Sequence, residues 1–206
     1  MTNARSPPDE TSEHAAAHDP ENRLFSRFPR RRLEAEAIWD KMLVTSGELN
    51  RTLYGPAVFP PIDPEVLKAM KNTKWSTPAT RSDWARRGIY IVVHRSLTYP
   101  FLETFNVTQP IVSCSRRDTT VVAPQALTLL NDRISTQLAE AFAERLKRAC
   151  GADVEKIIER GWQRAFSRSI TDRERQHARA FLKSDITRVS TWCLALFNTN
   201  EFIYVD

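Results

Sequence analysis

The sequence predicts a mainly α-helical protein: an irregular helical domain with a small β element and a loop-rich N-terminal half. Three features support this prediction. All 12 prolines lie at or before Pro124, so the last 82 residues (206 − 124) contain none. Only 5 residues of the whole chain are glycine. The proline-free part is rich in Ala, Leu, Glu and Arg, which favour helices, whereas the prolines interrupt regular structure before it.

Length and composition are those of a globular domain that follows a polar tail. Hydrophobic residues make up 41% of the chain and charged residues 27%, which excludes a disordered chain, a collagen-like repeat and a disulfide-dense mini-protein. Residues 1–22 differ, because they hold one arginine against five acidic residues and few large apolar groups. We therefore expect a disordered acidic tail over residues 1–22 and a single domain over residues 23–206.

The first expected helix spans about residues 31–49. Its apolar residues recur at the spacing of one buried helix face, and the pairs Arg30–Glu34 and Arg32–Glu36 would lie one turn apart. The predicted buried face consists of Ala35, Ile38, Trp39, Met42, Leu43, Ser46 and Leu49.

Residues 50–87 should be mostly loop, because proline and glycine interrupt them repeatedly. A short helix is expected to begin at Pro64, after an aspartate that can cap it. Residues 88–95, with the sequence GIYIVVHR, are the expected strand, because β-branched and aromatic residues follow one another there. Its partner would be residues 57–60 or residues 110–113.

Five helices are expected in series after Pro124. A proline is tolerated at the first position of a helix, and Thr171 with Glu174 three residues later forms a capping-box pattern. The helix that begins there should bury Phe181, and the apolar tail 202–205 should pack back on the domain. The expected helices cover residues 124–131, 133–149, 153–166, a fourth from Thr171, and 187–198.

The three cysteines, Cys114, Cys150 and Cys193, have no CxxC spacing, which excludes a zinc knuckle and a thioredoxin-like motif. Three buried thiols and a single disulfide both stay open. No apolar stretch reaches the roughly 18 residues of a membrane-spanning helix, and the N-terminus lacks the apolar core of a secretory signal. On its own the sequence would stay in the cytoplasm, unless it is part of a longer protein.

The densest polar segment is residues 113–120, Ser-Cys-Ser-Arg-Arg-Asp-Thr-Thr. A thiol beside two guanidinium groups would have a lowered pKa and could act as a nucleophile, with His94 as its base. Alternatively, the segment is a loop whose arginines and threonines bind backbone groups and cap the next helix. The candidate polar cluster comprises Arg95, Cys114, Arg116, Arg117, Thr119, Thr120 and Gln125.

Residues 25–32 form a basic segment in which arginines alternate with two phenylalanines and a proline. Such a mixture can bind phosphate groups or stack on bases. Alternatively, the arginines pair with Glu34, Glu36 and neighbouring carboxylates at the entry to the first helix. The candidate anion-binding residues are Arg27, Arg30, Arg31 and Arg32.

The sequence holds no recognisable catalytic or metal-binding motif. His94 and His177 have no second ligand one helical turn away, so they make a poor metal site. No HExxH, glycine-rich phosphate loop, GxSxG or CxxCH occurs, and the lack of CxxCH excludes covalent haem within this chain. We expect no metal and no cofactor, and nucleic acid is not an expected partner.

Four stretches and the end of the chain resemble one known family. They are Asn22-Arg23-Leu24 with residues 28–38, Gly55-Pro56 with Phe59-Pro60-Pro61, Arg86-Arg87-Gly88-Ile89-Tyr90 with Arg95-Ser96, residues 119–131, and Leu196-Phe197-Asn198 with Asn200-Glu201-Phe202. From about Asn22 to Asp206 the chain resembles the planctomycete-type domain of unknown function 1553.

The resemblance implies that the domain belongs at the C-terminal end of a long exported protein, behind a cytochrome c-like module and a companion domain. It implies an exported or cell-envelope location. No catalytic residues are established for the family, so none can be carried over. Family domains usually begin with a further helical stretch, whose place is taken here by the acidic tail. The resemblance therefore implies a truncated or split member.

The expected function is a non-catalytic structural or interaction module of a larger exported assembly. One alternative is an enzyme of unknown reaction that acts at the candidate polar cluster. Another is a weak binder of anionic polymers through the basic segment. The expected partner is another protein or the missing N-terminal half. Self-association is also expected, centred on Ile38, Trp39 and Met42 of the first helix, because large bare apolar patches are rare on soluble monomers.

Overall fold

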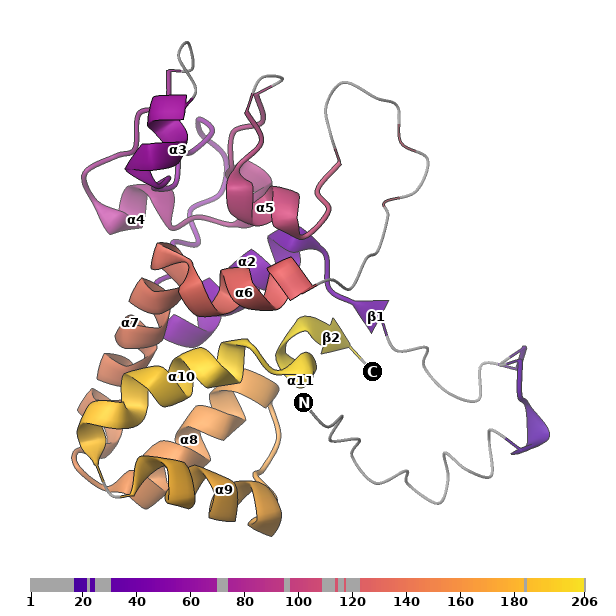
Figure 1. Ribbon diagram of the computed structural model, residues 1–206, viewed down its shortest axis with the longest axis vertical. Coiled ribbons are helices and arrows are strands. Elements are labelled where there is room, and N and C mark those ends of the chain that lie inside the picture. The colour runs from indigo at the N-terminus through magenta and orange to yellow at the C-terminus, as the bar shows by residue number, and fades with distance from the viewer. Residues whose placement is uncertain are drawn as a thin grey trace.

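The protein is described by a computed structural model, shown as a ribbon in Figure 1. The structure describes residues 17–21, 23–24, 31–69, 74–94, 97–108, 114, 117, 123–183 and 185–205. Most of the expected acidic tail lies outside the described residues, and the division into a tail and one domain stays a prediction. Within the described residues the fold is mainly α-helical with a small two-stranded sheet, as predicted.

The helices are short in the first half of the chain and longer after the last proline. The elements are β1 (Arg31–Arg32), α2 (Ala35–Ser46), α3 (Pro64–Ala69), α4 (Arg81–Trp84), α5 (Pro100–Thr104), α6 (Ala123–Asn131), α7 (Arg133–Cys150), α8 (Val154–Phe166), α9 (Asp172–Leu182), α10 (Val189–Phe197), α11 (Asn200–Ile203) and β2 (Tyr204–Val205).

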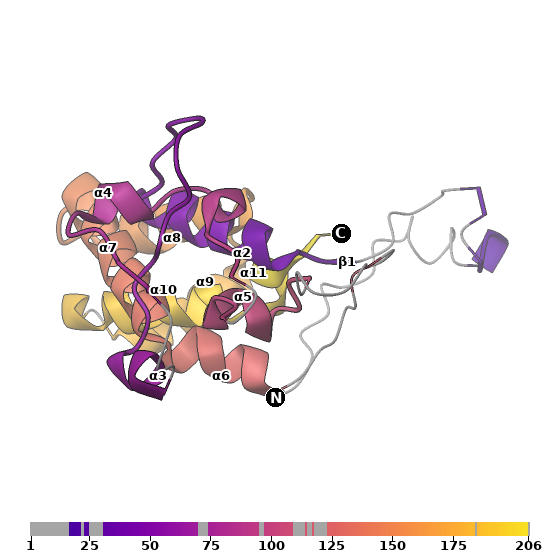
Figure 2. The same cartoon turned by 90° about the horizontal axis from the view of Figure 1, so that it is seen from above.

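The long helices form the body, and the short helices α3, α4 and α5 lie together at its upper end in Figure 1. Helix α7 runs along one side and packs against both α2 and α10, while α8 and α9 lie at the lower end. The chain between α2 and α3 projects from this body, as the top of Figure 2 shows. Residues 51–56 of this projection are called the arm below.

The sheet joins the two ends of the described body. Strands β1 and β2 are antiparallel, with Arg31 opposite Val205 and Arg32 opposite Tyr204. The apolar tail therefore packs back on the domain, as expected.

The strand predicted at residues 88–95 is wrong. Gly88–Tyr90 forms a 3-10 turn, and a single parallel bridge joins Val58 to Ile91. Residues 57–60, the first proposed partner of the strand, thus pair with residues 88–94 through Val58. The other, residues 110–113, lies outside the described residues.

Contacts with α2 explain why no strand forms there. The Asp40 carboxylate accepts the Gly88 N–H at 2.6 Å and the Arg87 Nε–H at 2.9 Å. A Cβ atom on Gly88 would lie 2.8 Å from the Cα of Glu36, so the segment packs against the helix backbone. Side-chain hydrogen bonds and close packing therefore outweigh the strand propensity of the sequence.

Helix α2 is shorter than the predicted 31–49 segment. It ends at Gly47, whose φ of 86° suits glycine, and the Gly47 N–H is donated to the carbonyls of Leu43 and Val44. The predicted face is buried as far as Ser46, and Leu49 is only partly buried. Ile38, Trp39 and Met42 are each 0% exposed. The expectation that these three residues form a bare surface is therefore wrong.

The predicted Arg32–Glu36 pair is also wrong, because Arg32 lies in β1 rather than in the helix. Its guanidinium donates instead to the Phe105 carbonyl at 3.2 Å. Arg30, from the other predicted pair, lies outside the described residues.

The C-terminal helices match the prediction closely. The capping box is present, since the Thr171 hydroxyl accepts the Glu174 N–H and the Glu174 carboxylate accepts the Thr171 N–H. The prediction that Phe181 is buried is wrong. Its side chain is 38% exposed, and the Arg188 guanidinium lies 5.3 Å from its ring centre.

Arg168 joins three elements just beyond α8. Its guanidinium donates two hydrogen bonds to Glu174 of α9, at 2.6 and 2.9 Å. It donates two more to Glu201 of α11, at 2.6 and 2.7 Å, and lies 5.5 Å from the Trp162 ring centre. Burial alone would raise the pKa of Glu174, but hydrogen bonds from Arg168 and Thr171 lower it from 4.5 to about 2.

Gly161 should tolerate no side chain. A Cβ atom there would lie 2.6 Å from the Trp192 ring of α10 and 3.2 Å from Leu146 of α7. We predict that Gly161→Ala lowers the free energy of unfolding by roughly 1–3 kcal/mol, the usual effect of overpacking a filled core. Urea denaturation measures this change, with Gln163→Ala on the exposed face of α8 as the control. A gain near 1 kcal/mol, the helix-propensity difference alone, would contradict the close packing.

The Glu174 carboxylate should make stability depend on pH. Because its pKa is lower in the folded chain, its contribution is present above pH 4.5 and is lost as the pH falls towards 2. We expect this contribution to be on the order of 1 kcal/mol, since solvent screens a partly exposed pair. Denaturation of the wild type and of Glu174→Gln between pH 6 and pH 2 measures it, and the difference should shrink on acidification. Glu140→Gln on exposed α7 surface is the control, and an equal pH dependence in the two variants would contradict this assignment.

Candidate functional site

Arg117 of the candidate polar cluster is held at the start of α2. Its guanidinium donates to the two carboxylate oxygens of Glu36 at 2.7 and 3.0 Å, and to Glu34 at 3.0 Å. The hydrogen bond to Glu36 is the main reason that the pKa of Arg117 is raised. The acidic first turn of the helix is thus paired with an arginine far away in the sequence. The contacts given for Arg117 are with carboxylates of α2 rather than with backbone groups of the next helix, so they do not match the capping alternative.

Cys114 lies near Arg117. Its side chain is exposed and forms no disulfide, so the interpretation of three buried thiols is wrong for this residue. Cys114 is close enough to Arg117 to contribute to its raised pKa. The contacts described for His94 are aromatic, with ring centres 6.0 Å from Phe59 and 6.3 Å from Trp75. The Cys114–His94 pair stays a prediction.

The other cysteines differ in their surroundings. Both are free thiols: Cys150 is partly buried and Cys193 is buried in α10. Burial raises the pKa of Cys193, so its thiol is kept protonated at neutral pH.

Several predicted site residues lie outside the described residues. In the candidate polar cluster these are Arg95, Arg116, Thr119 and Thr120, and in the basic segment they are Arg27 and Arg30.

Gln125 and Arg32 meet at the end of α5. The Gln125 side chain is 3% exposed and donates to the Thr104 carbonyl at 3.0 Å and to the Asn106 side-chain oxygen at 3.3 Å. Arg32 donates to that same oxygen at 3.0 Å. Burial lowers the pKa of Arg32. Both side chains therefore hold the C-terminal end of α5. Of the two described arginines of the basic segment, Arg31 is exposed and Arg32 is partly buried.

Arg86 holds the arm in place. Its side chain is 6% exposed and donates to the carbonyls of Thr52 and Pro56, each at 3.0 Å, and to the Tyr54 carbonyl. Its guanidinium also lies 3.9 Å from the Tyr90 ring centre, a cation–π contact. One buried side chain thus satisfies three carbonyls of a loop that forms no regular structure.

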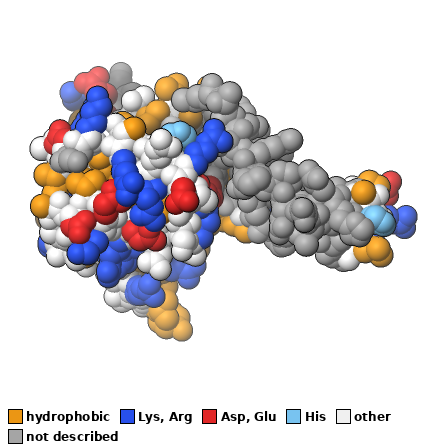
Figure 3. All heavy atoms as spheres, turned by 90° about the horizontal axis from the view of Figure 1, so that it is seen from below, with side chains coloured by type: hydrophobic (Ala, Val, Ile, Leu, Met, Phe, Trp, Pro, Cys, Tyr) orange, Lys and Arg blue, Asp and Glu red, His pale blue; other side chains and the backbone are white. Residues whose placement is uncertain are grey.

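The arm carries two exposed apolar side chains on a constrained backbone. Leu53 is 60% exposed and Tyr54 is 82% exposed. Tyr54 has a φ of 63°, a conformation that is rare outside glycine, and its N–H is donated to the Tyr90 hydroxyl at 2.8 Å. In Figure 3 a hydrophobic tip projects from the lower edge of the molecule.

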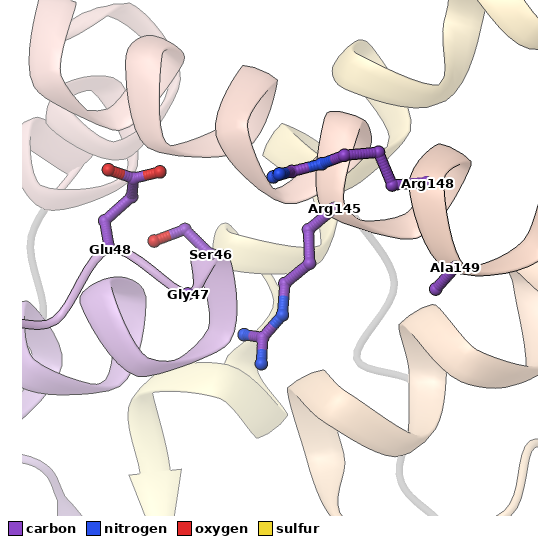
Figure 4. A pocket seen from close by; sticks show the side chains of 6 residues that line it. All are labelled: Ser46, Gly47, Glu48, Arg145, Arg148 and Ala149. Atoms are coloured by element: carbon purple, nitrogen blue, oxygen red, sulfur yellow. The ribbon is translucent and has the colours of Figure 1, made fainter.

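An open pocket of about 370 Å³ lies where the end of α2 meets α7. Figure 4 shows Arg145 and Arg148 extending from α7 toward α2, with Glu48 on the other side. Arg145 donates to the carbonyls of Val44 and Thr45 at 3.0 and 3.1 Å, so it caps the C-terminal end of α2. The lining residues are Ser46, Gly47, Glu48, Arg145, Arg148 and Ala149.

Among the described residues, no three His, Cys, Asp or Glu side chains are grouped as a metal site would require. No helix in the described part of the chain is long and apolar enough to cross a membrane.

Sequence reasoning missed Arg86 and the arginines of the pocket. Arg86 lies two residues after Trp84 in a part of the sequence that was interpreted as loop, so nothing marked its side chain as buried. The signal for the pocket was present, because Arg145 and Arg148 are three residues apart on a predicted helix. Two other residues, one of them Leu146, separate these arginines along the chain, so they form no unbroken basic run.

The comparisons with known proteins give one family. Its sequence profile, described as PSD1: Protein of unknown function (DUF1553), matches residues 5–182. The chain gave no significant match to a curated protein or to a solved structure. The matched segment covers most of the chain and begins ahead of Asn22, where the resemblance was expected to begin. It ends at Leu182 rather than at Asp206, so the last stretch of the expected resemblance lies outside it. This protein therefore belongs to the DUF1553 family, whose function is unknown.

Proposed function

We propose that the chain is a non-catalytic interaction module and that the arm is its protein-binding surface. The observation that carries this proposal is the exposure of Leu53 and Tyr54 on a loop that a buried arginine holds rigid. Two neighbouring large apolar side chains held out in water would be removed from water if a partner covered them, which favours binding at this position.

The constraint on the arm supports binding rather than chance exposure. Exposed loops normally lose conformational freedom when they bind, and that loss weakens affinity. Here the Arg86 contacts and the Tyr54–Tyr90 hydrogen bond already fix the backbone before a partner arrives. A rigid tyrosine with few rotatable bonds is also among the side chains that dominate binding energy at interfaces.

The contacts of the candidate polar cluster favour a non-catalytic role. Arg117 is engaged by two carboxylates, and Gln125 is buried against a helix end. Their described contacts are structural ones within the chain. In the setting that the family resemblance implies, the partner would be a neighbouring module of a larger exported, cytochrome c-linked assembly.

Site-specific photo-crosslinking tests the proposal. We replace Tyr54 by p-benzoyl-phenylalanine in the full chain, expressed in its native cells, and irradiate. We expect one discrete crosslinked protein, which mass spectrometry then identifies. The additional change Leu53→Ser should reduce its yield at least tenfold, because hot-spot truncations weaken binding by about 2 kcal/mol or more.

Phe181 provides the matched control position, because it is an aromatic residue that is exposed on α9, away from the arm. A product of twice the mass of the chain would identify a second copy as the partner and would support the proposal. The absence of a discrete product at position 54, or the same product from position 181, would overturn it.

A further inference from the structure

Helix α6 has apolar side chains on both its inner and its outer side. Leu129 is buried together with the amide of Gln125, whereas Leu127 is 56% exposed and Leu130 is 36% exposed. A helix at the surface of a soluble protein usually turns polar side chains to water, and a helix that is apolar all round is usually buried all round. The outer side of α6 therefore has the composition of a covered surface.

The exposed apolar residues form one continuous face. With about 3.6 residues per turn, Ala126, Leu130, Ala123 and Leu127 follow one another around the helix at intervals of about 40°. All four are exposed, and they are called the α6 face below. No residue of α6 carries a charge. Figure 2 shows α6 along the lower margin of the body, whereas the arm projects from the upper margin.

The α6 face is complementary to itself in side-chain size. Along the helix, two alanines, Ala123 and Ala126, come before two leucines, Leu127 and Leu130. If two copies of α6 pack antiparallel about the point between Ala126 and Leu127, each leucine lies over an alanine of the other copy. Large side chains opposite small ones let two helices interdigitate. A two-fold contact uses the same patch on both copies, so this match is made twice.

The charges at the two ends of α6 favour the same arrangement. Arg133 is exposed just beyond the C-terminal end of α6. Glu103 is exposed beside the N-terminal end, because Gln125 of α6 donates to the carbonyl of the adjacent Thr104 at 3.0 Å. Among the described residues, neither Arg133 nor Glu103 is paired with an opposite charge. In an antiparallel pair, Arg133 of each copy lies near Glu103 of the other.

A second copy also fits the overall charge of the chain. The net charge of +5 makes two copies repel each other at long range, so a contact between them needs a face that adds no further repulsion. The uncharged α6 face meets this requirement, and the two ion pairs at its ends offset part of the repulsion.

We propose that two copies of the chain associate through their α6 faces, packed antiparallel about a two-fold axis, with Arg133 of each copy beside Glu103 of the other. Helix α6 has 9 residues, so the contact is small and the complex is reversible. We expect a dimer with a Kd on the order of 10–100 µM. The contact does not involve the arm, so this proposal and the interaction module can fail separately.

Sedimentation velocity of the full chain, at concentrations from about 5 to about 500 µM, tests the proposal. The wild type should change from monomer to dimer as its concentration rises. The double variant Leu127→Gln/Leu130→Gln should weaken the dimer at least tenfold, because it removes apolar surface from the contact. Glutamine favours helices and both positions face water, so the monomer should keep its fold, which circular dichroism checks.

Charge reversal tests the antiparallel arrangement. Glu103→Arg and Arg133→Glu should each weaken the dimer at least threefold, because each places like charges together at both ends of the contact. The combined variant should return to within twofold of the wild type. Net charge alone would act in opposite directions in the two single variants. A combined variant that is no stronger than the single ones would overturn the proposed arrangement.

The control is Val44→Gln/Phe181→Gln, which removes two exposed apolar side chains from α2 and α9. It should change the Kd of the dimer less than twofold. Equal weakening in the control and in Leu127→Gln/Leu130→Gln would mean that apolar surfaces associate without specificity, and would overturn the proposal. A wild type that stays monomeric up to about 500 µM would also overturn it.

Discussion

The hydrogen bond from the Trp39 indole to the Arg86 carbonyl, 2.9 Å long, joins the two halves of the molecule. Trp39 is fully buried in the middle of α2, with the rings of Tyr99 and Phe101 5.6 and 5.8 Å away. The side chain of the same residue, Arg86, donates hydrogen bonds to backbone carbonyls of the arm. Together with the Asp40 contacts to Arg87 and Gly88, Trp39 therefore connects the helical body to the part of the chain that has little regular structure of its own.

Helix α2 provides the frame for the arm and the pocket. Its acidic start binds Arg117 from one distant loop, and its carbonyl end binds Arg145 from α7. Arg145 complements the partial negative charge at the C-terminal end of the helix, and Glu36 complements the partial positive charge at its start. Helix α2, which is 12 residues long, also packs along α7. It therefore contacts the segment that orders the arm, one wall of the pocket, and Arg117 of the candidate polar cluster.

The sequence predicted the helices after Pro124 well, because each has a strong apolar period and a local start signal such as the Thr171 capping box. It failed where distant contacts decide the backbone. Residues 88–95 have strand propensity, but Asp40 takes the Gly88 N–H and the segment turns instead. Arg32 was expected to pair within its own helix and instead reaches Asn106. The site was the hardest part to predict, since the burial of Arg86 against the arm arises only from packing.

The most direct test of this account is amide hydrogen exchange of the arm in Arg86→Lys. Lysine keeps the charge but cannot donate to three carbonyls at once in the planar arrangement of arginine. The account predicts that peptides covering residues 50–58 exchange at least tenfold faster, while those covering α7 and α10 keep their wild-type protection. Arg51→Lys, an exposed arginine of the arm itself, should leave both unchanged. Unchanged exchange of the arm in Arg86→Lys, or an equal loss of protection throughout the chain, would contradict the claim that Arg86 specifically orders the arm.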